Sequence, residues 1–215
     1  MHKSLAVVVI AVALAGPAVP AQAHTTAPVV IGAGHVDVVD VEYEDGALEL
    51  GLHDESVEPG VEREPSDVVL LVKRQAQTTV PADPAFAFLG AAGAKIWVLP
   101  EIQDDELLWP GLSTEELEAG VFAADTVALK VRGVTGPGRV AVWTEDAVGT
   151  PHVLANSGDG LPDVVPLTAG EHRHTSWAFQ RAGLYRITFA ATATLAGTGT
   201  VVSSAPATYT FVVQP

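Results

Sequence analysis

Hydrophobic and polar residues alternate with a period of two along much of the chain after residue 30. The alternation is clearest in "HVDVVDVEY" (35–43) and "ALELGLHD" (47–54), which are separated by the turn residues "EDG" (44–46). Because successive side chains of a strand point to opposite faces, this pattern predicts half-buried strands. Two such runs joined by a short Asp-Gly turn predict an antiparallel β-hairpin.

Further strands are predicted where β-branched and aromatic residues form runs bounded by Gly and Pro. Only "STEELEAGVF" (113–122) has a helical signature, because Ser113 and Glu116 have the spacing of a capping box. Short strands at regular spacing predict an all-β protein, an Ig-like antiparallel β-sandwich with at most one short helix near 113–122. The predicted strands cover 67–75, 94–100, 125–134, 138–146, 151–157, 172–180, 183–196 and 200–214.

The first 23 residues have the order of a secretory signal peptide. A basic start is followed by an apolar run and by "AQA", a small-residue cleavage site, so we expect a signal peptide over 1–23 and one sandwich domain over 24–215. No later run reaches the roughly 18–20 apolar residues that a membrane helix needs. We therefore expect an exported mature chain, secreted or associated with the cell surface, without a membrane span.

Acidic residues outnumber basic ones, and this imbalance narrows the classes of partner. The chain has 26 acidic and 11 basic residues, a formal net charge of −15. Twelve of the acids lie between Asp37 and Asp67. Such a surface repels phosphates, which argues against a nucleic-acid partner, and it concentrates cations. An acidic cluster of this kind is also typical of an ordinary solvated face.

Four histidines in predicted strands are candidate metal ligands. His172 and His174 lie two residues apart in a predicted strand and therefore point to the same face. His35 and His53 lie in the predicted hairpin, on the face opposite the core valines and leucines. Short-spaced imidazoles bind Zn, Cu or Ni, and a nearby carboxylate can ligate or fix the tautomer. The auxiliary candidates are Asp37, Asp54 and Glu171.

Each of these histidines also has an ordinary interpretation, as a hydrogen-bonded residue of an exposed strand. His24, if it becomes the mature N-terminus, would offer an α-amine and an imidazole to Cu(II), whereas we expect His152 to be structural. The chain has no Cys, and its one Met is Met1, so soft sulfur sites are excluded in the mature chain and Zn, Mn, Ni or Cu(II) remain. No serine lies in a G-x-S-x-G motif, and we expect no enzymatic activity.

Several motifs together resemble a family of exported proteins. The chain resembles the actinobacterial surface-anchored proteins that contain a choice-of-anchor M domain, and its segment from about 170 to 213 resembles their wall repeat. The motifs occur in order: "VVIGAGHVDV", "YEDGALELGLHD", "PADPAFAFLGAAGAKIWVLPEIQ", "LWPGLST", "VRGVTGPGRVAVW" and "HRHTSWAFQRAGLYRITFAATAT". Ser176 departs from the repeat, which usually has Asn before the Trp, and we expect the protein to lack the anchor that many members have.

The resemblance implies a role beside an ABC transporter whose relatives import metal ions. It places His35, His53, His172 and His174 on the family's own histidine positions. On this interpretation the protein captures a divalent transition metal, or a chelate such as haem, for the transporter's substrate-binding component or another cell-surface protein. The alternative is a structural or adhesive surface module without a metal site. Convergence of the four imidazoles on one point would favour metal binding, and their dispersal would favour the structural role.

Overall fold

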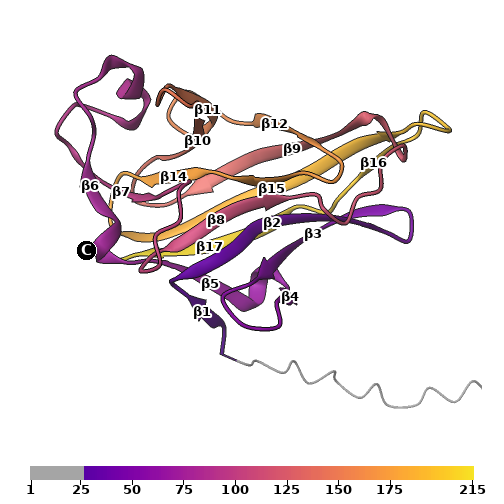
Figure 1. Cartoon of the computed structure of the whole chain (residues 1–215), viewed down its shortest axis with the longest axis horizontal. Coiled ribbons are helices and arrows are strands. Elements are labelled where there is room, and N and C mark those ends of the chain that lie inside the picture. The colour runs from indigo at the N-terminus through magenta and orange to yellow at the C-terminus, as the bar shows by residue number, and fades with distance from the viewer. Residues whose placement is uncertain (1–26) are drawn as a thin grey trace, which may run out of the picture.

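The computed structural model describes residues 27–215, which form an all-β protein (Figure 1). Its helical elements in this range are three short 3₁₀ turns, and none of them has the length and apolar character needed to span a membrane. The strands are β1 (Val29–Ile31), β2 (Gly34–Glu44), β3 (Ala47–Asp54), β4 (Val61–Arg63), β5 (Val68–Val72), β6 (Gln77–Thr79), β7 (Lys95–Leu99), β8 (Leu108–Ser113), β9 (Phe122–Thr135), β10 (Val140–Glu145), β11 (Pro151–Asn156), β12 (Asp163–Thr168), β13 (His172–His174), β14 (Ser176–Phe179), β15 (Gly183–Leu195), β16 (Val201–Ser203) and β17 (Ala207–Val213), and the 3₁₀ turns are η1 (Pro65–Asp67), η2 (Arg74–Ala76) and η3 (Pro84–Leu89).

The strands form three sheets. Sheet A has the order β1-β5-β17-β15-β9-β12, with β16 paired to β15; sheet B has the order β13-β8-β2-β3-β4; and sheet C has the order β11-β10-β14-β7-β6. The expected antiparallel pairing predominates, but the pairs β1–β5, β5–β17 and β2–β8 in this part of the chain are parallel. The prediction of a purely antiparallel sandwich is therefore wrong at these three pairs, which join strands far apart in the sequence.

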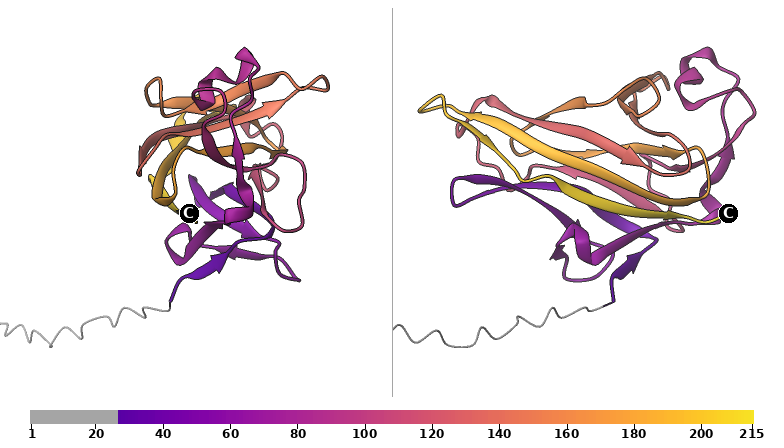
Figure 2. Two further views of the ribbon diagram at one scale, coloured as in Figure 1. Left: turned by 90° about the vertical axis from the view of Figure 1, so that its left-hand side faces the viewer. Right: turned by 180° about the vertical axis from the view of Figure 1, so that it is seen from behind.

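Sheets B and C lie side by side and cover one face of sheet A. Trp177 of sheet C is fully buried and packs on Phe189 and Phe211 of sheet A, with ring centroids 6.1 and 5.4 Å away. The Tyr209 hydroxyl of sheet A donates a hydrogen bond to the Gly51 carbonyl of sheet B, 2.8 Å away. Figure 2 shows β2 and β3 (indigo) packed beside the long β15 and β17 (orange to yellow). The predicted all-β sandwich is confirmed.

The predicted hairpin is present as β2 and β3. Asp45 and Gly46 form its two-residue turn, and both have positive φ values, 48° and 84°, as a type I′ turn requires. The pairing shifts between Asp37 and Asp40, where two residues of β2 stand opposite one residue of β3. This β-bulge lets the consecutive Val38 and Val39 both face the core, where each is 0 % exposed.

The predicted helix over 113–122 is wrong. Ser113 is the last residue of β8, and turns follow it up to the start of β9. The Ser113 hydroxyl does accept a hydrogen bond from the Glu115 amide, at 3.2 Å, so the local capping signal was real. However, β8 pairs with β2 on one side and β13 on the other, and this pairing overrides the local helical preference.

The predicted strand over 172–180 is two strands in different sheets. β13 belongs to sheet B and β14 to sheet C, and Thr175 alone separates them. Thr175 is fully buried; its amide donates to the Pro110 carbonyl, and its hydroxyl accepts from the Trp177 indole at 2.8 Å. The chain therefore crosses between sheets immediately after His174, which leaves β13 as a short edge strand of sheet B.

Candidate metal centre

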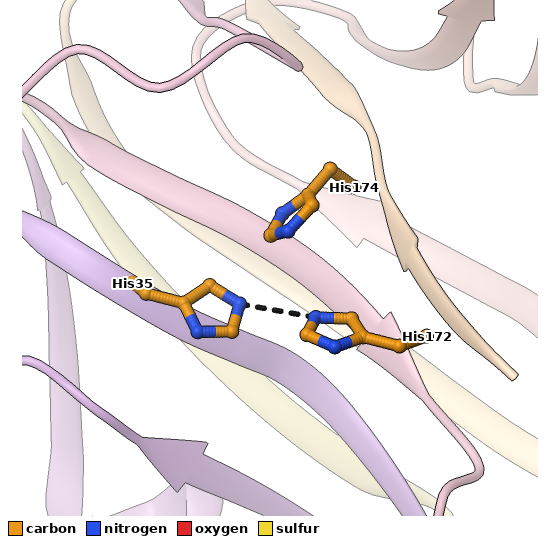
Figure 3. A group of neighbouring side chains, drawn as sticks. All are labelled: His35, His172 and His174. Carbon is orange, nitrogen blue, oxygen red and sulfur yellow. Dashed lines mark hydrogen bonds between the residues drawn. The ribbon is translucent and has the colours of Figure 1, made fainter. Parts of the chain in front are cut away.

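Three imidazoles converge on the face of sheet B that points away from sheet A. His35 comes from β2, and His172 and His174 come from β13 (Figure 3). Each offers one donor nitrogen, and the three nitrogens lie within 4.8 Å of one another. The ring centroids are 4.8 to 4.9 Å apart in every pair. Residues 137 positions apart in sequence thus form one compact triangle.

The strand between them, β8, makes this convergence feasible. Gly111 of β8 lies opposite Asp37 on one side and His174 on the other. Neighbouring strands are about 4.8 Å apart, so side chains from β2 and β13 must lean over β8 to meet. A Cβ atom at Gly111 would overlap the Asp37 carboxylate and lie 3.3 Å from His172 Nε2. The glycine therefore provides the space in which the donors meet.

Asp37 supplies an oxygen donor beside the imidazoles. Its Oδ1 lies 3.0 Å from His172 Nε2 and 3.6 Å from His35 Nε2, and it forms a second, overlapping group of possible donors with His172 and Glu115. The residue is only 3 % exposed, and Oδ1 has no hydrogen-bond partner of acceptable geometry. A buried carboxylate oxygen without a hydrogen bond is costly unless a cation lies nearby. This oxygen therefore points to a ligand of positive charge.

Carboxylates contact the Nδ1 atoms of two of the rings, on the side away from the other imidazoles. Glu55 pairs with His35 Nδ1, and Glu115 Oε2 lies 3.4 Å from His172 Nδ1. The two Nε2 atoms consequently face each other, 3.1 Å apart. Ligating histidines in metalloproteins commonly donate their other ring N–H to a carboxylate in this way, which fixes the tautomer and the ring orientation.

His174 is held by an aromatic ring instead. It stacks on Trp109 with ring centroids 3.6 Å apart and planes 7° from parallel. Burial lowers the pKa of His174 to about 4, and the neighbouring His35 and His172 add to this effect. Its Nδ1 is buried without a hydrogen-bond partner. His174 is therefore neutral at physiological pH, as a ligating imidazole must be.

The pKa of His35 moves in the opposite direction. Burial alone would lower it, but the negative charges of the neighbouring Asp37 and Glu55 and the hydrogen bond to Glu55 outweigh burial and raise the pKa. The site thus stabilises positive charge at the position of His35 Nε2, whether a proton or a metal ion supplies it. The charge of Asp37 is one source of the negative potential that raises the pKa of His35.

The donor set fits a four-coordinate transition metal. Zinc–nitrogen bonds are about 2.0–2.1 Å long, so two nitrogens in a tetrahedral site lie about 3.3 Å apart. The two Nε2 atoms are already 3.1 Å apart. His174 adds a third nitrogen to this group, and Asp37, beside His35 and His172, adds an oxygen.

The expected four-histidine shell is wrong in one member. His53 lies opposite Asp37 in the ladder, on the same face, but its donor atoms group with Asp40 and Glu62 rather than with the three imidazoles. The cause is the strand order: β3 lies on the far side of β2 from β8 and β13. His53 is thus one strand too far away.

Two of the three auxiliary carboxylates form hydrogen bonds and ion pairs with residues outside the cluster. Asp54 is 1 % exposed and accepts hydrogen bonds from Arg63 Nε at 2.7 Å and from the Ser56 amide at 3.0 Å. Glu171 pairs with the Arg173 guanidinium and accepts from the Thr168 amide. Both predictions are corrected to structural roles; Asp37 is the auxiliary residue that lies in the cluster.

The sequence interpretation did not identify Glu55, Glu115, Trp109 or Gly111. Glu55 directly follows "HD" in the hairpin and could have been included with its neighbours. The other three lie on or just after β8, which was not among the predicted strands, and Glu115 fell in the mistaken helix. Recognising "LWPGLS" as a strand would have indicated Trp109 and Gly111.

The other histidines are apart from this cluster. His24 and the predicted signal peptide over 1–23 lie outside the described residues. His152 is on β11, well exposed, with Asp146 3.8 Å away. A groove of about 680 Å³ lies further along sheet B, beside β3, β4 and residues 203–208, and none of the three converging histidines lines it.

The comparisons with known proteins add no relative. No family model matches the chain, and no curated protein matches it either. The resemblance to the choice-of-anchor M proteins therefore remains a prediction from the motifs.

Proposed function

We propose that the protein captures a divalent transition-metal ion through His35, His172, His174 and Asp37. The observation that carries the proposal is the convergence of three imidazoles from two separate strands, beside a buried carboxylate oxygen that lacks a hydrogen bond. Surface histidines without a shared ligand would not be expected to converge over a glycine. The convergence therefore favours a binding protein over a purely structural or adhesive module.

The donor set favours zinc among the candidate ions. Imidazole nitrogen suits Zn, Cu and Ni, whereas Mn prefers oxygen ligands. With Asp37 as the fourth ligand, the shell has no open position at which a substrate could bind, which is typical of a binding site rather than a catalytic one. The cluster lies outside the groove of sheet B, and this favours a bare ion over a haem-sized chelate.

The setting of this site is also a proposal. We propose that the protein acts outside the cytoplasm, at the cell surface, and passes its ion to the substrate-binding component of an ABC transporter. The signal-peptide pattern, the acidic composition and the motif resemblance support this role. Accessible donors, with His172 at the surface, are consistent with transfer of the ion to a partner.

The test is metal binding by the purified protein and by matched variants. Titration calorimetry with Zn²⁺, Ni²⁺, Cu²⁺ and Mn²⁺ should show Zn²⁺ uptake that a His172→Ala/His174→Ala double variant loses. We expect the affinity to fall at least about 100-fold, since loss of an outer-shell partner alone commonly costs about 10–100-fold.

His152→Ala is the control, because this exposed histidine lies outside the cluster and its loss should leave zinc affinity unchanged. Circular dichroism of each variant separates loss of ligands from loss of fold. Equal zinc affinity in the wild type and the folded double variant would refute the assignment and support the structural alternative.

A further inference from the structure

A second group of donor atoms lies on the same face of sheet B, toward β3 and β4. Asp40 of β2, His53 of β3 and Glu62 of β4 each offer one donor atom, and the three atoms lie within 4.8 Å of one another. His53 Nδ1 is 2.7 Å from Glu62 Oε1, and the two residues are opposite in the ladder. Three adjacent strands thus contribute one donor each.

Asp40 provides independent evidence for a ligand. It is 1 % exposed, and its Oδ1 has no hydrogen-bond partner. Burial raises its pKa; the nearby Asp37 and Glu116 add to this, while Ser113 and His53 oppose it. A buried carboxylate with an unpaired oxygen is costly. A cation held between Asp40 and its two neighbours would remove that cost.

The β-bulge of β2 is what brings Asp40 to this face. With strict alternation from Asp37, Val39 would share the face of Asp37, and Asp40 would point into the core. Because Val38 and Val39 are both buried, Asp40 returns to the donor face. Bulges commonly re-aim a side chain beside a functional site. Here the bulge interrupts the β2–β3 pairing by one residue and places a buried carboxylate beside His53.

The surroundings of this group pack closely against its imidazole and are rich in carboxylates. A Cβ atom at Gly60 would lie 2.5 Å from His53 Nε2, so a larger residue there would displace the imidazole. Glu62 lines the groove of about 680 Å³, together with Glu42, Glu49 and Glu64. Asp40 and His53 do not line this groove, but its carboxylates concentrate cations next to Glu62.

We propose that Asp40, His53 and Glu62 form a second divalent-cation site, separate from the three-histidine centre. Its two carboxylates and one imidazole make a harder, more oxygen-rich set than the first, and such a set suits Mn²⁺. The two negative charges balance the charge of the ion, and water completes its coordination. The second site does not depend on metal binding at the first.

Mn²⁺ is the probe, measured by loss of the free-ion signal in electron paramagnetic resonance. The background is the His172→Ala/His174→Ala double variant of the full chain, in which the first centre is disabled. This protein should bind one equivalent of Mn²⁺. Adding Glu62→Gln should weaken that binding at least about tenfold, and Asp40→Asn should weaken it further because its carboxylate is buried.

Glu49→Gln is the matched control, since it removes the same charge from the same groove but leaves the three donors intact. Because Glu62 is about half exposed, at 51 % of its side chain, its variant is expected to fold even where Asp40→Asn does not. Mn²⁺ binding that is equal in the Glu62→Gln and Glu49→Gln proteins would overturn the second site.

The two proposals fail separately. If zinc binding is insensitive to the His172/His174 changes but Mn²⁺ binding requires Glu62, the first site is wrong and the second stands. If the wild type binds a single metal equivalent that disappears in the double variant, the second site is wrong and the first stands.

Discussion

At the scale of single residues, Glu55 shows how a carboxylate that does not reach the metal position can control it. Glu55 pairs with His35 Nδ1, and its other oxygen lies 4.0 Å from His53 Nε2. Replacing Glu55 with Gln should remove the charge that fixes the His35 ring. We expect zinc affinity to fall by about 10–100-fold, measured by calorimetry.

Glu44→Gln is the control for Glu55. Glu44 lies at the exposed end of β2, so this change removes one charge from the same strand without altering the partner of His35. A similar loss of affinity in both variants would mean that general charge, rather than orientation of His35, controls binding.

The substitution Gly111→Ala gives a more specific prediction, because it adds only a methyl group. In Gly111→Ala the added carbon would overlap the Asp37 carboxylate. Asp37 would have to move out of the cluster, so we expect zinc affinity to fall more than tenfold and stability by about 1–3 kcal/mol. Gly133→Ala, at a strand position where a Cβ meets nothing within 4 Å, should leave zinc affinity unchanged. Calorimetry and urea denaturation check both.

The alternation along β2 predicts His35 on the outer face, and the burial of Val36 and Val38 confirms it. The position of Asp40 was harder to predict, because it depends on the bulge. The double valine in "VDVVDV" is the trace of that bulge in the sequence, but alternation alone does not say which of the two neighbouring valines would leave the core face. The role of Gly111 could not be predicted from the sequence either, because the residues that it makes room for, Asp37 and His172, are more than 60 positions away.

At the scale of elements, β13 matters most because it is a three-residue edge strand that carries two ligands. Only its pairing with β8 ties it to sheet B. A metal bound between His35 and β13 would connect β2 to β13 across β8. Zinc should therefore slow hydrogen exchange of amides in 172–174 by up to about 100-fold when the ion is present at 100 times its dissociation constant.

The edge strand β12 of sheet A is the control for this exchange measurement, since it has no ligand. Its amides in 163–168 should exchange at the same rate with and without zinc. Equal protection of both edge strands would indicate a global effect of zinc rather than a link between β2 and β13.

Elements with strong local patterns were predicted well, and elements defined by distant partners were not. The β2–β3 hairpin has both its alternation and its turn chemistry in one stretch of sequence. In contrast, β8 reads "LWPGLS", with a Pro and a Gly that weaken any local strand signal. It becomes a strand because β2 and β13 pair with it, and neither partner is its neighbour in the chain.

At the scale of the whole molecule, the sandwich imposes a pH dependence on the metal-free protein. An unfolded histidine titrates near pH 6.5. The pKa of His174 is lowered to about 4 in the folded state, mainly by burial and then by the positive charges of His35 and His172, while Asp37 opposes these effects. Between these two pH values the folded state binds fewer protons than the unfolded chain, so the free energy of unfolding falls as pH drops from 6.5 to 4.

His35 contributes with the opposite sign. Its folded pKa is raised, so the stability it provides is present below pH 6.5 and is lost as pH rises through that folded pKa. The two histidines together should therefore give the metal-free protein a local maximum of stability near pH 6.5. Zinc would shift this balance, because it replaces the proton that His35 otherwise holds.

Urea denaturation in EDTA at pH 4.5, 6.5 and 8 tests this balance. His174→Gln should flatten the acid side of the profile, by on the order of 1 kcal/mol because solvent screens a partly buried ring. His35→Gln should flatten the alkaline side and leave the acid side in place. Asp40 and Glu62, whose pKa values are also raised, titrate alike in all three proteins, so the differences between profiles report only the histidines. If both variants keep the wild-type slope on each side, the imidazoles are solvated independently of one another, and the compact cluster on which metal capture depends is absent in solution.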